Sequence, residues 1–159
     1  MAAIFFDVDG TLVRWRGDYA DIVTDAFERG GITATDERLG YYDDRFFHHF
    51  GEFADDPYHR AFTDVCDRFG LDADPRRVAD ALVAAEFEAV EPVPGVESVV
   101  ASLAEEHTLG LLTNGVPAVQ FGKVEDIGLL DHFDVRVASH DAEIETTKRR
   151  VNALEFKLL

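Results

Sequence analysis

Two aspartates near the N-terminus are the residues of this chain best suited to chemistry. Asp7 and Asp9 follow the apolar run 3–6 and precede Gly10 and Thr11. If that run is a strand that continues through them, both carboxylates lie on the same side, about 6–7 Å apart. Carboxylates that close repel each other unless a cation or a proton lies between them. Because glycine lets the backbone turn and approach a ligand closely, the pattern predicts a site for Mg²⁺ and an anionic group.

A second strand with a polar end favours this site over an ordinary Asp-Gly turn, which is the alternative. The apolar run 108–112 ends in Thr113, Asn114 and Gly115, and Pro117 follows at a position typical of a first helical turn. In open α/β sheets, ligands bind at the carboxyl ends of the strands. We therefore expect the two strand ends to meet in one site.

Four predicted helices separate the two motifs. Apolar residues recur at helical spacing in segments that begin near residues 18, 39, 56 and 74, with no strand pattern between them. A helical bundle inserted into an α/β sheet explains this order better than a series of βαβ units. We predict a core formed by residues 1–16 and 92–159 and a helical domain at 17–91, with connectors at 13–17 and 90–95.

The two motifs, and the stretches that follow them, resemble the haloacid dehalogenase-like hydrolase superfamily. The resemblance covers roughly residues 3–147 and includes the DxDGT signature and the strand that ends in Leu-Leu-Thr-Asn-Gly. It points to the branch in which a helical cap is inserted just after the first strand of a Rossmann-like parallel sheet. It implies a Mg²⁺-dependent phosphatase that acts on a small phosphorylated metabolite, with a phosphomutase or a dehalogenase as less favoured readings.

The resemblance implies a role for each polar residue at the strand ends. Asp7 is the expected nucleophile, which attacks phosphorus and forms an aspartyl-phosphate. Asp9 is the expected acid that protonates the leaving oxygen and then activates water. Thr113, Asn114 and Gly10 are expected to bind the phosphoryl oxygens. Mg²⁺ is expected on the Asp7 side chain and the Asp9 carbonyl. Dehalogenases of this superfamily usually lack the second aspartate, so its presence favours phosphoryl transfer.

The chain departs from the family pattern near its C-terminal end. The family has a lysine that balances charge in the transition state, and Lys148 is the nearest candidate. Lys123 is the second candidate, although its place in a predicted helix favours a solvent-facing lysine. The family's last motif, Gly-Asp with another acid beyond it, is missing; Asp141, Glu143 and Glu145 are the acids nearest to that role. The alternative prediction is therefore a truncated, inactive phosphate-binding fragment or pseudoenzyme.

Composition narrows the expected partners and setting. The 159 residues include 32 acidic and 15 basic ones, for a net charge of −17. Such a surface repels nucleic acid and anionic membranes, so neither is an expected partner. Concentrated salt screens the repulsion, which favours a halophilic archaeon as the source. No apolar run approaches the roughly 18 residues of a membrane span, and no signal peptide is recognisable. With Cys66 as the single cysteine, we expect a cytoplasmic protein whose oligomeric state stays open.

Overall fold

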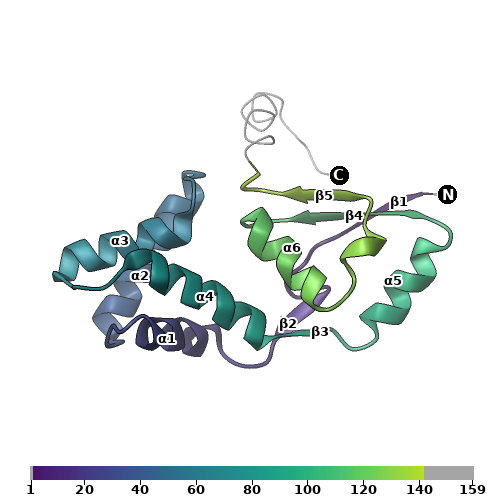
Figure 1. The fold of residues 1–159 in the computed structure, drawn as a ribbon. Coiled ribbons are helices and arrows are strands. Elements are labelled where there is room, and N and C mark those ends of the chain that lie inside the picture. The colour runs from purple at the N-terminus through teal and green to yellow at the C-terminus, as the bar shows by residue number, and fades with distance from the viewer. Residues whose placement is uncertain (1, 142–159) are drawn as a thin grey trace. The chain divides into compact units, whose positions relative to one another are not determined.

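The computed structural model describes residues 2–141, which divide into two compact units. Unit 1 combines Met1–Arg14 with the chain from Glu91 onward, and unit 2 is Trp15–Val90. Unit 1 contains both polar motifs, and unit 2 contains four consecutive helices (Figure 1). The chemistry predicted from the sequence therefore falls within a single unit.

Unit 1 is built on a three-stranded parallel sheet of order β1-β4-β5 (Figure 1). Its strands are β1 (Ala3–Phe6), β4 (Thr108–Thr113) and β5 (Val135–Ala138). The register pairs Phe6 with Leu111 and Thr113 with Ala138, so the strands end toward the same edge of the sheet. The predicted α/β class with a parallel sheet is confirmed.

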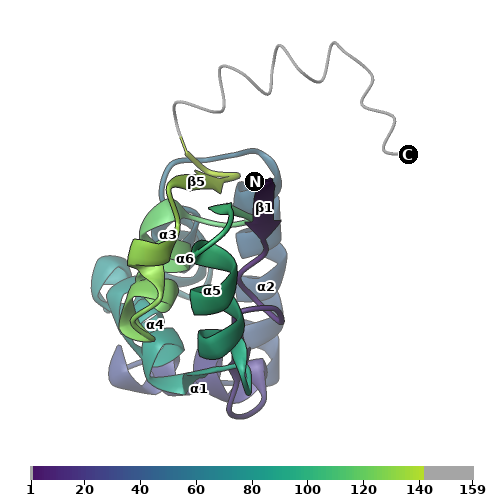
Figure 2. The ribbon, with the colours of Figure 1, turned by 90° about the vertical axis from the view of Figure 1, so that its right-hand side faces the viewer.

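Helices α5 (Val96–Ala104) and α6 (Pro117–Asp126) both lie on one face of this sheet (Figures 1 and 2). On that face, Leu109 and Leu111 are buried. On the opposite face, Phe5 and Leu112 are 50% and 57% exposed, and no unit 1 helix within residues 2–141 covers them. A short 3-10 helix, η1 (Leu130–His132), leads into β5. The sheet therefore has one packed face and one open apolar face in the described part of the chain.

Unit 2 consists of four helices, each of which begins at a side-chain cap. They are α1 (Tyr19–Arg29), α2 (Asp36–Gly51), α3 (Pro57–Phe69) and α4 (Pro75–Ala89). Asp18, Thr35, Asp56 and Asp74 each accept a hydrogen bond from a backbone N–H in the first turn. Such caps stabilise a helix by about 1 kcal/mol relative to alanine. The four helices predicted from apolar spacing are thus confirmed.

The core of unit 2 is aromatic. Phe27, Tyr42 and Phe62 are each at most 1% exposed, and their ring centroids lie 4.4 to 5.9 Å apart. Edge-to-face and offset ring pairs of this kind add about 0.5–1.5 kcal/mol beyond the burial of their area. The rings come from α1, α2 and α3, so their packing joins three of the four helices.

The two predicted connectors contain short strands. β2 (Val13–Trp15) and β3 (Val90–Pro92) form a two-stranded sheet where the chain leaves unit 1 and where it returns. Three residues are too few for an alternating pattern to be recognised in a sequence. These strands bring the start and the end of the helical insertion side by side.

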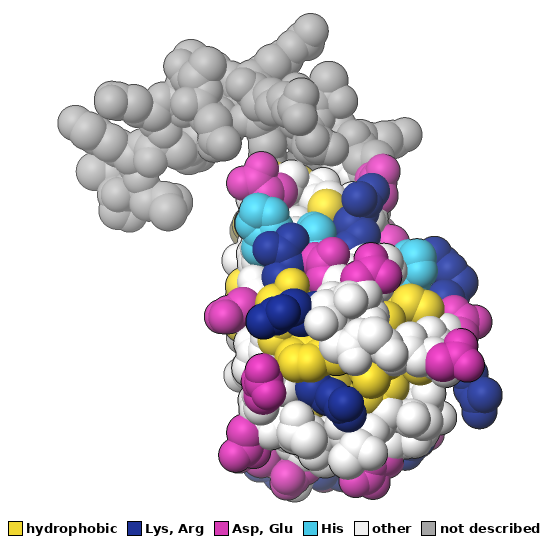
Figure 3. All heavy atoms as spheres, turned by 90° about the vertical axis from the view of Figure 1, so that its left-hand side faces the viewer, with side chains coloured by type: hydrophobic (Ala, Val, Ile, Leu, Met, Phe, Trp, Pro, Cys, Tyr) yellow, Lys and Arg dark blue, Asp and Glu magenta, His cyan; other side chains and the backbone are white. Residues whose placement is uncertain are grey.

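Acidic and basic side chains are interspersed on the face of the molecule shown in Figure 3, with hydrophobic side chains exposed between them. In unit 2, Arg29 pairs with Asp25 at 2.6 Å and with Glu88 at 2.7 Å. Exposed pairs are screened by water and contribute little, so the aromatic core is the larger source of stability in unit 2. None of the helices in the described range combines the length and the apolar character needed to cross a membrane.

Candidate active site

Asp7 and Asp9 lie immediately after strand β1 and not within it, because β1 ends at Phe6. The chain then turns at Gly10, which has a φ of 78° and donates its N–H to the carbonyl of Val13 at 2.8 Å. A φ in this region favours glycine. The two aspartates therefore lie beyond the regular strand, and the Gly10 N–H is engaged inside the turn that follows them.

Asp7 lines a pocket of about 430 Å³ at the carboxyl ends of the strands. The other lining residues are Leu112, Thr113, Asn114, Val137 and Ser139. One oxygen of the Asp7 carboxylate accepts a hydrogen bond from the N–H of Val8 at 2.8 Å. The structure thus brings together three of the residues predicted from the sequence: the expected nucleophile and the two polar residues at the end of β4.

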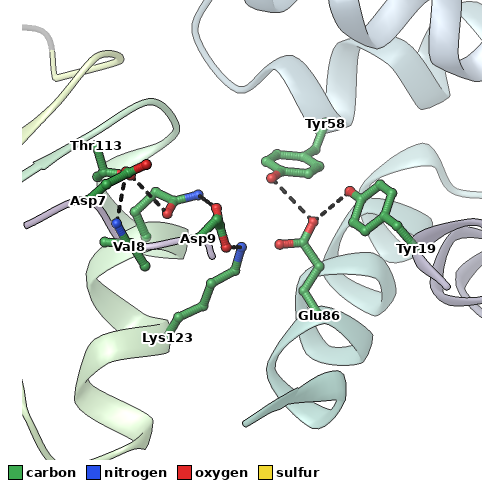
Figure 4. A network of polar contacts seen from close by, with 9 residues as sticks. Asp7, Val8, Asp9, Tyr19, Tyr58, Glu86, Thr113 and Lys123 are labelled. Atoms are coloured by element: carbon green, nitrogen blue, oxygen red, sulfur yellow. Dashed lines mark hydrogen bonds and ion pairs between the residues drawn. The ribbon is translucent and has the colours of Figure 1, made fainter. Parts of the chain in front are cut away.

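Asp9 is held by two side chains from helix α6 (Figure 4). The ammonium Nζ of Lys123 lies 3.2 Å from Oδ1, and the amide Nε2 of Gln120 donates to Oδ2 at 3.0 Å. The Thr113 hydroxyl in turn donates to Oε1 of Gln120 at 3.2 Å. The side chain of Lys123 is 2% exposed, whereas that of Asp9 is 39% exposed. The network therefore joins the turn after β1, the end of β4 and helix α6.

The prediction that Lys123 is a solvent-facing helix lysine is wrong, because the structure buries this side chain. Helix α6 buries Lys123 together with Val119, Gln120 and Val124. Gln120 and Lys123 are three positions apart and so lie on the same side of the helix. That spacing is visible in the sequence, but the sequence does not show which side of α6 faces the rest of the unit. Lys148 lies outside the described residues.

Asp7 and Asp9 supply oxygen ligands of the kind that Mg²⁺ prefers. Within residues 2–141, no group of three or more histidine, cysteine, aspartate and glutamate side chains is placed to hold a metal ion. Mg²⁺ is usually bound by one or two carboxylates and keeps several waters, so this pair fits its needs in part. Because Lys123 and Gln120 engage the Asp9 side chain, Asp7 offers the more available carboxylate. Glu143 and Glu145 lie outside the described residues.

Unit 2 contains a buried polar network that the sequence analysis missed (Figure 4). The carboxylate of Glu86 in α4 is 1% exposed and accepts hydrogen bonds from the Tyr19 hydroxyl at 2.8 Å and the Tyr58 hydroxyl at 3.4 Å. Burial, with the nearby Glu86 charge, raises the pKa of the Tyr19 phenol far above its usual value. Glu86 lies four residues after Leu82 and seven after Ala79, so the apolar face of α4 was a signal that could have revealed it.

Comparison with known proteins places this arrangement among hydrolases. A family model described as haloacid dehalogenase-like hydrolase matches residues 1–151. The pyrimidine 5'-nucleotidase YjjG of Escherichia coli (strain K12) is 28% identical over 81 residues, which are 51% of this chain and 36% of that protein. The match therefore spans about a third of this relative's length.

Solved structures share the fold. A HAD-hydrolase from Bacillus subtilis, YfnB, solved bound to magnesium, has a TM-score of 0.61 at 22% identity and aligns with 89% of this chain and 66% of its own. A protein from Thermotoga maritima, named as a β-phosphoglucomutase, has a TM-score of 0.60 at 19% identity, over 96% of this chain and 71% of its own. The chain thus spans about two thirds of the length of these proteins, and at such identities the likeness concerns the fold.

Proposed function

Because this chain belongs to the haloacid dehalogenase-like hydrolase family, we propose that it represents a Mg²⁺-dependent phosphatase acting on a small phosphorylated metabolite. The main support is the grouping at the sheet edge. Asp7 lines one pocket with Thr113 and Asn114, and Asp9 follows two residues later. A nucleophile, an acid and polar groups for an anion are the parts that transfer of a phosphoryl group to a carboxylate requires.

In the proposed reaction, a carboxylate oxygen of Asp7 attacks phosphorus as the bond between phosphorus and the leaving oxygen breaks. Asp9, in its protonated form, gives its proton to that leaving oxygen, and an aspartyl-phosphate remains. The Asp9 carboxylate then takes a proton from water, which attacks phosphorus, releases phosphate and regenerates Asp7. Mg²⁺ bound by Asp7 would offset the repulsion between the carboxylate and the phosphate.

Thr113 and Asn114 are the proposed ligands of the phosphoryl oxygens. The Thr113 hydroxyl donates to Gln120 in the structure, so donation to a phosphoryl oxygen requires that this hydrogen bond be exchanged. Gly10 contributes through the turn that it permits. Lys148 stays a prediction for the cation that balances charge in the transition state.

We also propose that unit 2 acts as a cap that selects the substrate. Its four helices are inserted between β2 and β3, the position that a cap has in the proposed architecture. Nucleoside monophosphates belong in a substrate panel because the relative YjjG is a pyrimidine 5'-nucleotidase. The net charge of −17 supports a source with a salt-rich cytoplasm, so molar KCl is the appropriate assay medium.

The test is hydrolysis of p-nitrophenyl phosphate by the purified chain in molar KCl, with and without Mg²⁺. We expect hydrolysis to require Mg²⁺ and to fall by at least about 10³-fold in Asp7→Asn, which lacks the nucleophile. Glu125→Gln changes an exposed residue of α6 and is the matched control. Hydrolysis that persists in Asp7→Asn would overturn the mechanism. A folded chain with no hydrolysis would support the alternative, an inactive phosphate-binding fragment or pseudoenzyme.

A further inference from the structure

Both oxygens of the Asp9 carboxylate receive a donor from a single helix. Lys123 takes Oδ1 and Gln120 takes Oδ2, and the ion pair joins residues 114 positions apart in the chain. A carboxylate with a donor on each oxygen is fixed in rotation as well as in position. Helix α6 therefore determines the direction in which the remaining lone pairs of this carboxylate point.

Burial makes Lys123 a strong constraint on Asp9. The Lys123 side chain is 2% exposed, so its charge is almost wholly removed from water. Separating a buried charge from an ion-pair partner is costly, because little water is available to replace that partner. Any movement of Asp9 away from Lys123 incurs part of that cost. The ion pair thus restrains the aspartate much more firmly than an exposed pair would.

Gln120 fixes the orientation of the Asp9 carboxylate, which the ion pair with Lys123 alone does not fix. Its Oε1 accepts a hydrogen bond from Thr113, which directs its Nε2 donor toward Asp9. Gly115 makes room for this side chain, since a Cβ at that position would lie 2.6 Å from Cγ of Gln120. The loop after β4, which supplies the pocket, therefore also supports the amide that holds Asp9.

The held carboxylate stays accessible, because the Asp9 side chain is 39% exposed. An ionised carboxylate has about four lone-pair positions, and the two donors from α6 use two of them. The others can carry a proton to or from a bound molecule. For an acid of this kind, a misplacement of about 1 Å can reduce the rate about 10²-fold.

We propose that Lys123 and Gln120 are positioning residues that aim the Asp9 carboxylate at the leaving oxygen of the phosphate ester. This inference rests on the proposed phosphatase function and adds two residues that act on the reaction through Asp9. The proposal predicts that loss of Lys123 or Gln120 slows the step in which the leaving group is protonated more than the other steps.

The first experiment compares two esters that differ in their need for an acid. The p-nitrophenolate ion leaves without a proton, whereas the glycerol oxygen of glycerol 2-phosphate requires one. The measured quantity is kcat/KM, which reports the steps up to loss of the leaving group. In Lys123→Met we expect a fall of about 10²-fold with glycerol 2-phosphate and less than about 10-fold with p-nitrophenyl phosphate.

Three further variants make this comparison decisive. Lys123→Arg keeps the cation and should recover much of the lost activity, and Gln120→Leu should show the same selective loss to a smaller degree. Glu125→Gln, exposed on the same helix, should affect neither ester. Equal losses on both esters in Lys123→Met and Gln120→Leu would overturn the proposal, since a purely structural role predicts that result.

The second experiment does not depend on turnover. The chain has only three lysines, Lys123, Lys148 and Lys157, so ¹⁵N-lysine labelling gives a simple spectrum. We expect one ammonium signal to be protected from exchange with water, to disappear in Lys123→Arg and to shift in Asp9→Asn but not in Glu125→Gln. If the position of the Lys123 ammonium signal does not change in Asp9→Asn, the proposal is overturned. If the wild-type chain hydrolyses neither ester, the proposed function fails, and this signal still decides whether Lys123 holds Asp9.

Discussion

Asp9 in unit 1 and Glu86 in unit 2 are both carboxylates within polar networks. In unit 1 the buried group is the partner of the carboxylate, whereas in unit 2 it is the carboxylate itself. In unit 1 the cation is buried and the carboxylate is open: Lys123 is 2% exposed and Asp9 39%. In unit 2 the carboxylate itself is enclosed, since Glu86 is 1% exposed and accepts hydrogen bonds from tyrosine hydroxyls. An open, oriented carboxylate can exchange protons with a ligand, whereas an enclosed one can only hold its surroundings together.

The local structure around each residue accounts for this contrast. Asp9 lies between the end of β1 and the turn at Gly10, where its side chain stays 39% exposed. Glu86 lies within helix α4, on the same face as Leu82 and Ala79, and is enclosed with them. Loops on a rigid scaffold commonly carry function, while buried helix faces carry packing.

The largest expected difference between the two carboxylates is in the loss of activity when each is replaced by its amide. Asp9→Asn removes the proposed acid and should lower kcat/KM for an alkyl phosphate by about 10²–10⁴-fold. Glu86→Gln leaves the sheet edge unchanged, so kcat of the folded protein should stay within about twofold. Steady-state kinetics, with the folded fraction measured by circular dichroism, provides the comparison. A loss in Glu86→Gln as large as that in Asp9→Asn would refute the distinction.

Stability should distinguish the two carboxylates in the opposite sense, with the larger effect expected at Glu86. Glu86→Ala leaves the Tyr19 and Tyr58 hydroxyls without the carboxylate and opens a small cavity in unit 2. We expect the free energy of unfolding to fall by about 2–4 kcal/mol. Urea denaturation measures it, with the exposed Glu125→Ala as a control expected to remain within about 0.5 kcal/mol. An unchanged midpoint for Glu86→Ala would mean that the tyrosine network contributes no net stability.

A glycine in each unit offers a finer comparison. In Gly30→Ala a Cβ would lie 2.5 Å from Cγ2 of Val78, and in Gly115→Ala it would lie 2.6 Å from Cγ of Gln120. Each clash should cost about 1–3 kcal/mol of stability. Only Gly115→Ala, which displaces the amide that holds Asp9, should also lower kcat/KM. Thermal denaturation and kinetics on both variants test this, and a selective loss of activity in Gly30→Ala would contradict it.

Alkaline pH should weaken unit 2 by a smaller and graded amount. Burial, reinforced by neighbouring tyrosine and Glu86 charges, raises the pKa of Tyr42 as it does that of Tyr19, so both phenols keep their protons in the folded chain. The unfolded chain releases these protons near pH 10, which makes unfolding more favourable as the pH rises further. Stability should therefore be unaffected below about pH 9 and fall by up to about 1.4 kcal/mol per pH unit per tyrosine above pH 10.

Urea denaturation at pH 8 to 11 measures this slope. Tyr19→Phe removes one of the two phenols and should flatten it, whereas the exposed Glu125→Gln should leave it unchanged. A Tyr19→Phe slope equal to that of the wild type would show that the Tyr19 phenol ionises equally easily in the folded and unfolded chains.

Local physics determined much of the fold from the sequence alone. Asp56-Pro57 marks the start of α3 and Gly70 its end, because a capping carboxylate, a fixed proline φ and a left-handed glycine act within a few residues. The same holds for the strands that end at Phe6 and Thr113 and for the placement of the polar motifs after them. The pocket residues Asp7, Thr113 and Asn114 follow from these strand ends, because parallel strands present their carboxyl ends at one edge.

Only the tertiary structure decided which helix faces turn inward. Lys123 looked like a solvent-facing lysine because its helix gives no local reason to bury a charge; its burial depends on a carboxylate 114 residues earlier. Glu86 is enclosed for a similar reason, since the hydroxyls that donate to its Oε1 come from α1 and α3. Capping and strand periodicity act between neighbours in the chain and can be read from it. The pairing of buried polar groups is fixed only when distant segments pack, because each group is tolerated inside solely through its partner.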